Sequence, residues 1–427
     1  MKRIFNIQRV VSAFLLVILS GSSSERVEHS LAYPLMAGQM HNTELHDSLR
    51  IEYDLKAINI STEIATLKAQ GENLPARLLN NLYATFYKQL EFDKACLNLL
   101  DNVDFERDTL SLEQRKALKQ LLMVSQFYFN IYSSNEYAKR IINLGNSSYE
   151  IPVDVLMVYE SILFSGEYRE ALMRQNKSGG AFDYAAFIDQ LPATRSDVEA
   201  FIDIDNSLDL PFKAFESLTF NGSYLFSSIV GYFEGSYEAR HNATKLLEVL
   251  QPFDIVLMKS SQNLTDFFIP GYFGHSAIWL GSDRHHAFSE KPTKPNIDSP
   301  YMIEAVREGV KMSSLEEFAS GEVFLVLRPK NLTLSQKVSV FHNSTMHLGK
   351  PYDFNFDSEA SDMISCPELT FLTYDFIDWE TGSLLNKTFI TPDDLFTTAT
   401  RDTSIEIVAM IEHGMLTEYP DAEQLKF

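Results

Sequence analysis

The stretch that decides the fold of the second half of the chain is Ile364-Ser365-Cys366-Pro367-Glu368-Leu369, which places a cysteine where a helix should begin. Proline suits the first turn of a helix. Apolar residues then follow at helical spacing: Leu369, Leu372, Phe376 and Ile377. Because a helix amino terminus carries partial positive charge and free N–H groups, it stabilises a thiolate. The sequence therefore predicts a reactive cysteine, Cys366, at a helix start.

Two further motifs supply partners for this thiol. His275 opens the alternating run Gly274-His275-Ser-Ala-Ile-Trp279, which is typical of a half-buried strand, and Glu304 lies in a second such run over residues 301–306. A thiol, an imidazole and a carboxylate are the parts of a nucleophile, its general base and the group that orients the base. Each residue alone is more often structural. Their combination predicts Cys366 as nucleophile, His275 as base and Glu304 as the orienting group.

The pattern of apolar residues along the chain changes near residue 250. The first half has apolar residues at three- and four-residue spacing, which predicts helices over Asp47–Gln70, Leu78–Leu100, Leu112–Tyr132 and Val153–Gln175, with a serine cap at Ser111. The second half mixes strands with helices, and the expected elements are strands at Asp254–Met258 and Val323–Arg328, a helix at Leu334–Leu348 and a capped helix start at Thr391. We expect an α+β protein in which a helical domain, residues 25–250, precedes an α+β domain, residues 251–427.

The first 24 residues have the pattern of an export signal. Lys2, Arg3 and Arg9 give a positive start, an apolar core runs from Val10 to Leu19, and small residues follow. Because the apolar core is about half the length needed to span a bilayer, a cleaved signal is favoured over an anchor. The chain also holds Asn-X-Ser/Thr triplets, at Asn59, Asn146, Asn176, Asn221, Asn242, Asn263, Asn331, Asn343 and Asn386. These fit either a glycosylated eukaryotic secretory protein or an Asn-rich bacterial one, periplasmic or extracellular.

Composition excludes several classes of protein. The formal net charge of −22 argues against nucleic-acid binding, which needs clustered Lys and Arg. The sequence has no Cys-X-X-Cys, His-Glu-X-X-His or calcium-loop motif, so we expect no metal and no cofactor. The two cysteines, Cys96 and Cys366, form no disulfide framework. One bridge between them is the alternative to a free nucleophile, and we expect Cys96 to be a small buried apolar residue.

From about Gln251 to Thr397 the chain resembles the circularly permuted papain-like hydrolases, related to the NlpC/P60 superfamily, and especially the YiiX-like branch. In that family the histidine strand precedes the cysteine helix, as it does here. The resemblance rests on seven segments, which occur in the family order: Pro252-Phe-Asp254-Ile-Val-Leu, Gly274-His275-Ser-Ala-Ile, Ile303-Glu304-Ala with Gly309-Val310, Leu327-Arg-Pro, Gly349-Lys-Pro-Tyr352-Asp-Phe, Ser365-Cys366-Pro-Glu368-Leu and Thr391-Pro-Asp-Asp-Leu. The helical half has no counterpart in this resemblance.

The resemblance implies Cys366 as nucleophile, His275 as base and Glu304 as the polar third residue. Pro367 departs from the family pattern, in which serine commonly follows the cysteine, and proline lacks the N–H that could stabilise an oxyanion. The Cys366 N–H is still available for that purpose, and the Tyr352 hydroxyl is a further candidate. An apolar segment lies just before the histidine, and it either lines an acyl pocket, packs in the ordinary way or forms a lid: Phe267, Phe268, Ile269, Tyr272 and Phe273.

The predicted activity is acyl transfer at an amide, ester or thioester bond through a thioacyl-enzyme, by a hydrolase or an acyltransferase. The substrates implied are peptides, lipids or acylated small molecules. The helical domain is a candidate site for a protein partner, and the sequence leaves contact with a membrane surface open. The alternative is an inactive member of the fold that serves as a binding or scaffolding protein.

Overall fold

The structure is a computed structural model, and it describes residues 43–105, 108–174, 184–189, 191, 237–259, 271–281, 297–299, 301–353, 356–360, 362–384, 387–420 and 425. The expected export signal, residues 1–24, lies outside the described residues. The chain divides into two compact units. The first holds Met1–Glu72 and Asn81–Asn206, and the second holds Asn73–Asn80 and Ser207–Phe427.

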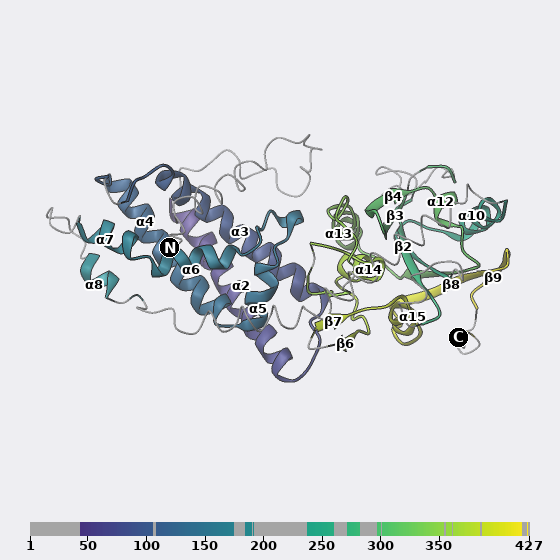
Figure 1. Ribbon diagram of the computed structural model, residues 1–427. Helices are drawn as coiled ribbons and strands as arrows, with labels where there is room; N and C mark the ends of the chain where they lie inside the picture. The colour runs from purple at the N-terminus through teal and green to yellow at the C-terminus, as the bar shows by residue number, and fades with distance from the viewer. Residues whose placement is uncertain are drawn as a thin grey trace, which may run out of the picture. The chain divides into compact units, whose positions relative to one another are not determined.

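The regular elements in the described parts of the first unit are helices, as the sequence predicts, apart from one isolated bridge between Asn146 and Ile151 (Figure 1). Its elements are α2 (Thr43–Ala69), α3 (Ala76–Leu100), α4 (Leu112–Tyr128), η1 (Phe129–Ser133), α5 (Glu136–Asn143), η2 (Ser147–Tyr149), α6 (Val155–Phe164), α7 (Gly166–Arg174) and α8 (Tyr184–Ile188). Ser111 caps α4 as expected, because its side chain accepts a hydrogen bond from the backbone N–H of Gln114. The short helix α5 was not predicted from the sequence.

The prediction of one continuous helix at the end of this unit is wrong. The expected single helix over Val153–Gln175 is two helices, α6 and α7, because Ser165 between them is extended, with φ −68° and ψ 121°. The Arg169 guanidinium donates to the Leu163 carbonyl, 2.8 Å away, and so satisfies a group at the end of α6. Apolar spacing continues across the break, so periodicity alone could not reveal it.

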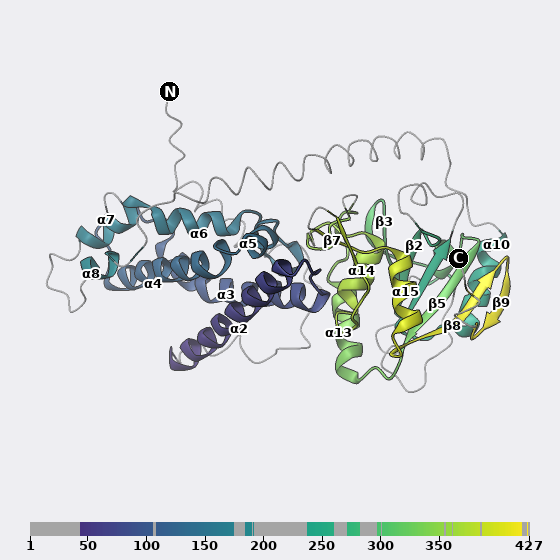
Figure 2. The same cartoon turned by 90° about the horizontal axis from the view of Figure 1, so that it is seen from below.

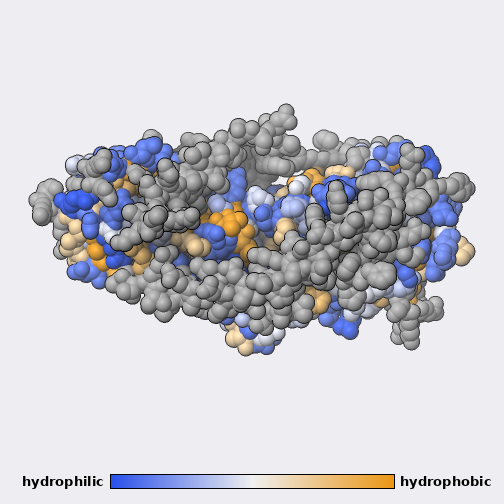
Figure 3. All heavy atoms as spheres, viewed as in Figure 1, coloured by the Kyte–Doolittle hydropathy of each residue, from blue (hydrophilic) through white to orange (hydrophobic). Residues whose placement is uncertain are grey.

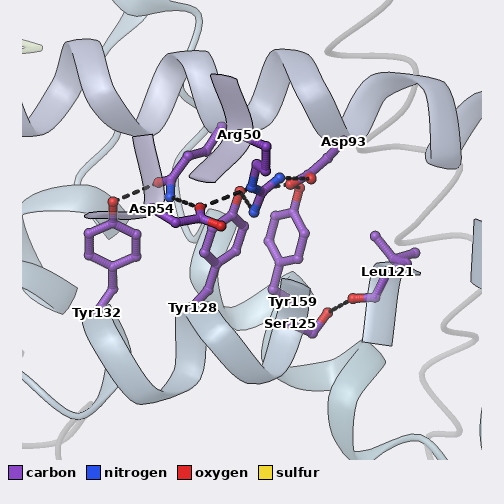
Figure 4. Close-up of polar contacts among 9 residues, drawn as sticks. Arg50, Asp54, Asp93, Leu121, Ser125, Tyr128, Tyr132 and Tyr159 are labelled. Atoms are coloured by element: carbon purple, nitrogen blue, oxygen red, sulfur yellow. Dashed lines mark hydrogen bonds and ion pairs between the residues drawn. The ribbon is translucent and has the colours of Figure 1, made fainter. Parts of the chain in front are cut away.

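A buried polar network joins the helices of the first unit (Figure 4). Nη1 of Arg50 on α2 donates to Oδ1 of Asp93 on α3 over 2.7 Å. The hydroxyls of Tyr128 on α4 and Tyr159 on α6 donate to Oδ2 of the same carboxylate over 2.8 and 2.9 Å. A second chain of bonds runs from Tyr132 to Gln89 to Asp54, over 2.7 Å in each step. Because a buried carboxylate needs partners, this network fixes the register of four helices.

The second unit is built on an antiparallel sheet, which has seven strands within the described residues, in the order β4-β3-β2-β1-β5-β8-β9. The strands are β1 (Asp254–Lys259), β2 (His275–Trp279), β3 (Met302–Val306), β4 (Gly309–Ser313), β5 (Val323–Pro329), β8 (Ile405–Glu412) and β9 (Met415–Glu418). A separate hairpin pairs β6 (Gly382–Leu384) with β7 (Lys387–Phe389). The α+β class is therefore confirmed, while the strands β4, β6, β7, β8 and β9 were not predicted from the sequence.

Helices cover both sides of this sheet (Figure 2). They are α10 (Tyr237–Val249), α12 (Leu315–Phe318), α13 (Leu334–Thr345), α14 (Cys366–Thr373) and α15 (Pro392–Arg401). A core cluster joins Ala243 and Leu246 of α10 and Phe318 of α12 to the strands, through residues that include Ala277 and Trp279. On the other side α14 packs against β2 and β3. The helix α10, which precedes the expected domain boundary at residue 250, thus belongs to the core of this unit.

A short segment from the first half of the sequence also belongs to the second unit. Nδ2 of Asn73 donates to the carbonyls of Thr381 and Gly382, at 3.2 and 3.0 Å. Nδ2 of Asn80 donates to the Leu372 carbonyl in α14 over 3.0 Å and to Oδ2 of Asp375 over 2.9 Å. Residues 73–80 therefore supply hydrogen bonds to the helix that carries Cys366.

The described surface mixes polar and apolar residues. Figure 3 shows hydrophilic residues spread over the visible face with hydrophobic ones between them. None of the helices in the described part of the chain combines the length and the apolar character needed to cross a membrane.

Candidate active site

Cys366 is the first residue of α14, as the sequence predicts. Ser365 before it is extended, and its backbone N–H donates to Oε2 of Glu368 over 2.7 Å, which fixes the start of the helix. Because first-turn N–H groups have no partner within their own helix, the Cys366 N–H is available, and no described residue accepts a hydrogen bond from it. The thiol is buried and free, and Cys96 is free as well but only partly buried, whereas a buried side chain was expected there.

His275 lies at the start of β2 and contacts a carboxylate on the neighbouring strand. Its Nε2 is 2.7 Å from Oε2 of Glu304 in β3, and the ladder pairs Glu304 with Ala277, two residues beyond the histidine on the same face. The ring also forms a hydrogen bond with Cys366. Because Nε2 contacts Glu304, Nδ1 is the ring nitrogen that remains for Cys366. The fold thus brings together the three residues that the sequence predicts for the site.

The electrostatics of the site favour a charged imidazole. Burial alone would lower the pKa of His275, but the negative charge of Cys366, its hydrogen bond with the ring and the Glu304 carboxylate together raise this pKa to about 10. Burial alone would raise the pKa of Glu304, but the hydrogen bond from His275 and further contacts with Ser313 and Lys311 lower it. Both shifts favour a charged imidazolium paired with an ionised Glu304 carboxylate.

Tyr352 lies beside Cys366, which places a phenol at the candidate nucleophile. Burial raises the pKa of Tyr352 well above its usual value, and the nearby charges of Cys366 and Glu368 add to the effect. The segment before Tyr352 is held by β4, because the Val310 N–H donates to the Lys350 carbonyl over 2.8 Å. Gly309 is needed at this point, since its φ is +110° and a Cβ there would lie 2.3 Å from the Lys350 carbonyl oxygen.

A buried acidic group, Glu368, lies two residues after Cys366 in α14. Glu368 is 1% exposed, and its burial, with the charges of Asp353 and Asp357 nearby, raises its pKa well above the usual value. Asp357 forms an ion pair with Lys387 over 3.3 Å. Burial and these neighbouring acids therefore make the Glu368 carboxyl easier to protonate than an exposed one.

Tyr272 and Phe273 hold the turn that leads into His275. Their backbone N–H groups donate to Oδ2 and Oδ1 of Asp393, at 2.7 and 2.8 Å. The Phe273 ring is buried and lies 5.9 Å from that of Phe396, while Nζ of Lys259 lies 3.8 Å from the Tyr272 ring centroid. These contacts favour the packing alternative for Phe273. The preceding aromatic residues, Phe267 and Phe268, lie outside the described part of the chain.

Three residues near the site were not predicted from the sequence. Asp393 binds the turn before His275, and Ser313 on β4 donates a hydrogen bond to Oε1 of Glu304. The Phe318 ring lies 5.7 Å from that of His275. Asp393 belongs to the Thr391-Pro-Asp-Asp-Leu motif, so a signal for it existed, whereas Ser313 and Phe318 carry none in the sequence. No group of three or more His, Cys, Asp or Glu within the described ranges is placed to hold a metal ion.

The part of the chain that holds Cys366, His275 and Glu304 matches a family of known proteins. Residues 249–418 match the family model of the permuted papain-like amidase enzymes, the YaeF/YiiX or C92 family. The match confirms the family resemblance for this part of the chain, and it extends beyond Thr397 to include β8 and β9.

Among solved structures, the chain is similar to the metalloprotein yiiX from Escherichia coli O157:H7. The sequences are 21% identical over 40% of this chain and 98% of that one, with a TM-score of 0.30. No curated protein matches the sequence.

Proposed function

We propose that the protein is a cysteine-dependent hydrolase or acyltransferase that acts on an amide, ester or thioester bond through Cys366, His275 and Glu304. One observation carries the proposal: the His275 ring interacts with the Cys366 thiol on one side and with Oε2 of Glu304, 2.7 Å away, on the other. This is the arrangement of a nucleophile, a base and an orienting carboxylate. The match to a family of amidases supports an amide as the bond that is cleaved.

The mechanism begins from the ion pair. The Cys366 thiolate attacks the carbonyl carbon of the substrate, and an S–C bond forms as the carbonyl π electrons move to oxygen. When the tetrahedral intermediate collapses, the bond to the leaving group breaks, and the His275 imidazolium gives its proton to that group. Water then attacks the thioacyl carbonyl, His275 takes the proton of that water, and the acid and free thiolate are released. In an acyltransferase another nucleophile replaces the water.

Two donors are available to stabilise the oxyanion. The Cys366 N–H lies at the amino terminus of α14, and no described residue accepts a hydrogen bond from it. The Tyr352 hydroxyl, beside the same thiol, is the second donor that we assign to this role. Both would act near the position where negative charge develops on the carbonyl oxygen, and removal of one such donor costs about a hundredfold to a thousandfold in rate.

We also propose that the protein is exported and that its substrate is a peptide, a lipid or an acylated small molecule. Export rests on the positive start and apolar core of residues 1–24. Amino-terminal sequencing of the protein recovered from the cell envelope or medium tests it, and an intact Met1 would contradict a cleaved signal. For the helical unit we propose the binding of a protein partner.

Trapping of the acyl-enzyme tests the activity. Reaction with a p-nitrophenyl ester should give a burst of nitrophenol and a protein whose intact mass has increased by one acyl group. The burst and the added mass should both be lost in Cys366→Ala, and the burst rate should fall about a hundredfold or more in His275→Ala. Cys96→Ser serves as the matched control and should keep both signals. An unchanged burst in Cys366→Ala, or none in the native protein, would overturn the proposal in favour of a binding or scaffolding role.

A further inference from the structure

A buried serine contacts the second oxygen of the candidate orienting carboxylate. The Ser313 side chain is fully buried at the end of β4, and its Oγ donates a hydrogen bond to Oε1 of Glu304. The other oxygen, Oε2, is 2.7 Å from Nε2 of His275. The two oxygens of one carboxylate are thus divided between the imidazole and the serine hydroxyl.

The register of three strands produces this arrangement. Glu304 on β3 pairs with Ala277 on β2 and with Lys311 on β4. His275 lies two residues from Ala277, and Ser313 lies two residues from Lys311, so both share the face of Glu304. They are its diagonal neighbours on opposite sides, within reach of a long side chain. A serine one position earlier or later on β4 would point to the other face of the sheet.

The segment that begins with Ser313 also contacts the imidazole of His275. Ser314, which follows Ser313, caps α12, because its Oγ accepts a hydrogen bond from the Glu317 N–H over 3.1 Å. This short helix carries Phe318, whose buried ring lies 5.7 Å from the His275 ring at an angle of 38° between planes. One turn of chain, residues 313–318, therefore contacts both Glu304 and His275.

We propose that Ser313 is a positioning residue, which holds the Glu304 carboxylate in the orientation that aligns His275 with Cys366. This inference rests on the proposed function, since alignment matters only if Cys366 and His275 act together. A carboxylate bound through one oxygen can rotate about its terminal bond, which is a soft torsion. A second hydrogen bond, to Oε1, removes that freedom and favours the charged form of the carboxylate.

Paired substitutions isolate the hydroxyl of Ser313 from its volume. All are made in a Cys96→Ser background, so that Cys366 is the remaining thiol. Ser313→Ala removes the hydroxyl, while Ser313→Thr and Ser313→Val add similar volume and differ mainly in the presence of the hydroxyl. Ser276→Ala is the matched control, because Ser276 is a fully buried strand serine beside His275 whose Oγ has no hydrogen-bond partner within the described residues.

Two readouts report on the site without any substrate. One is the rate of Cys366 alkylation by iodoacetamide as a function of pH, and the other is the titration midpoint of the His275 ring measured by NMR. In Ser313→Ala and Ser313→Val we expect alkylation at pH 7 to slow by roughly three- to tenfold, the effect of one hydrogen bond. The acid limb of the alkylation profile should move to higher pH, because Glu304 loses a contact that favours its charged form. The His275 midpoint should fall by about half a unit to one unit for the same reason.

The control variants should behave differently. Ser313→Thr should keep the rate and the midpoint near those of the parent protein, and Ser276→Ala should change neither. If Ser313→Ala does not fold, the comparison of Ser313→Thr with Ser313→Val decides the question. Equal rates and equal His275 midpoints for these two variants, or a Ser313→Ala protein that matches Ser276→Ala, would overturn the role of Ser313.

The outcome is distinguishable from a failure of the proposed function. Suppose that the native protein forms no acyl-enzyme but its His275 midpoint depends on Ser313 as expected. This result would contradict the proposed activity and would still support the contact between Ser313 and Glu304. If the protein is active and its Ser313 variants behave like the parent, the proposed activity is supported and the positioning role of Ser313 is contradicted.

Discussion

Nε2 of His275 lies 2.7 Å from Oε2 of Glu304, although 29 residues separate the two in the chain. The antiparallel pairing of β2 with β3 places Glu304 opposite Ala277 and so within diagonal reach of His275. Because Nε2 is occupied in this way, Nδ1 is the ring nitrogen that remains for Cys366, whose interaction with the ring raises the pKa of His275. The contact therefore determines which ring nitrogen can take the proton of the thiol. It also explains why the pKa shifts favour the charged forms of both His275 and Glu304.

The charge state of His275 gives the first prediction. The folded pKa of about 10 lies above the ordinary value of 6.5, so the folded state binds this proton more tightly than the unfolded state does. The resulting stabilisation is complete below about pH 6.5 and is lost as the pH rises through about 10. NMR titration of the His275 ring should show it protonated at pH 8, and the absence of the signal in His275→Gln assigns the resonance.

Removal of each partner should lower this midpoint by a different amount. Cys366→Ala should lower the His275 pKa by about one to three units, because the charge of Cys366 makes the largest contribution that raises it. Glu304→Gln should lower it less. A larger effect of Glu304→Gln, or a ring that is neutral at pH 7 in the native protein, would contradict this electrostatic description.

The two cysteines should differ in reactivity. Burial, with the charge of Asp93 nearby, raises the pKa of Cys96 to about 11, so little thiolate forms there at pH 7. Cys366 lies at a helix start beside the His275 ring, whose raised pKa favours the charged imidazolium. We expect iodoacetamide to label Cys366 much faster than Cys96 at pH 7, as measured by peptide mass spectrometry. Raising the pH to 11 should increase the Cys96 rate, and equal rates at pH 7 would contradict an activated Cys366.

The contact of Asn80 with the nucleophile helix gives a prediction about stability. Its side chain donates to the Leu372 carbonyl and to Asp375, so Asn80→Ala removes two hydrogen bonds and leaves two acceptors without this donor. We expect the free energy of unfolding of the second unit to fall by about 1–2 kcal/mol, measured by denaturant titration. Asn81→Ala is the matched control, because Asn81 is an exposed neighbour on α3 and should change stability by less than about 0.5 kcal/mol. Equal effects of the two substitutions would show that the Asn80 contacts do not stabilise this unit.

The buried network of the first unit gives a second stability prediction. Asp93→Ala removes the acceptor of Arg50, Tyr128 and Tyr159 and leaves the Arg50 charge buried with one fewer partner. Such a change costs about 3–5 kcal/mol. Glu52→Ala is the control, because it breaks an exposed pair with Lys56, 2.7 Å long, and such pairs contribute at most about 1 kcal/mol. Thermal unfolding followed by circular dichroism compares the two, and a similar loss in both would contradict the role of the network.

The sequence predicts where helices and strands occur more accurately than it predicts where they begin and end. The caps at Ser111 and Thr391, the helix start at Cys366 and the strands around His275 and Glu304 agree with the structure, because each depends on a few neighbouring residues. The break at Ser165 and the strands β8 and β9 were missed. Apolar spacing persists across the break, and the pairing of β8 with β5 joins residues far apart in the chain.

The sequence by itself determined the α+β class and the helix start at Cys366, since these follow from local spacing. It also indicated Cys366 and His275 as candidate catalytic residues from spacing and motif order, and Glu304 mainly through the family resemblance. Only the tertiary structure decided that Ser313 contacts Glu304, that Asp393 binds the turn before His275, and that Asn80 donates to the helix of Cys366. These contacts join residues that lie close only once the sheet has its register and the helices have packed. Pairing register depends on the whole face that is buried, so no single motif specifies it.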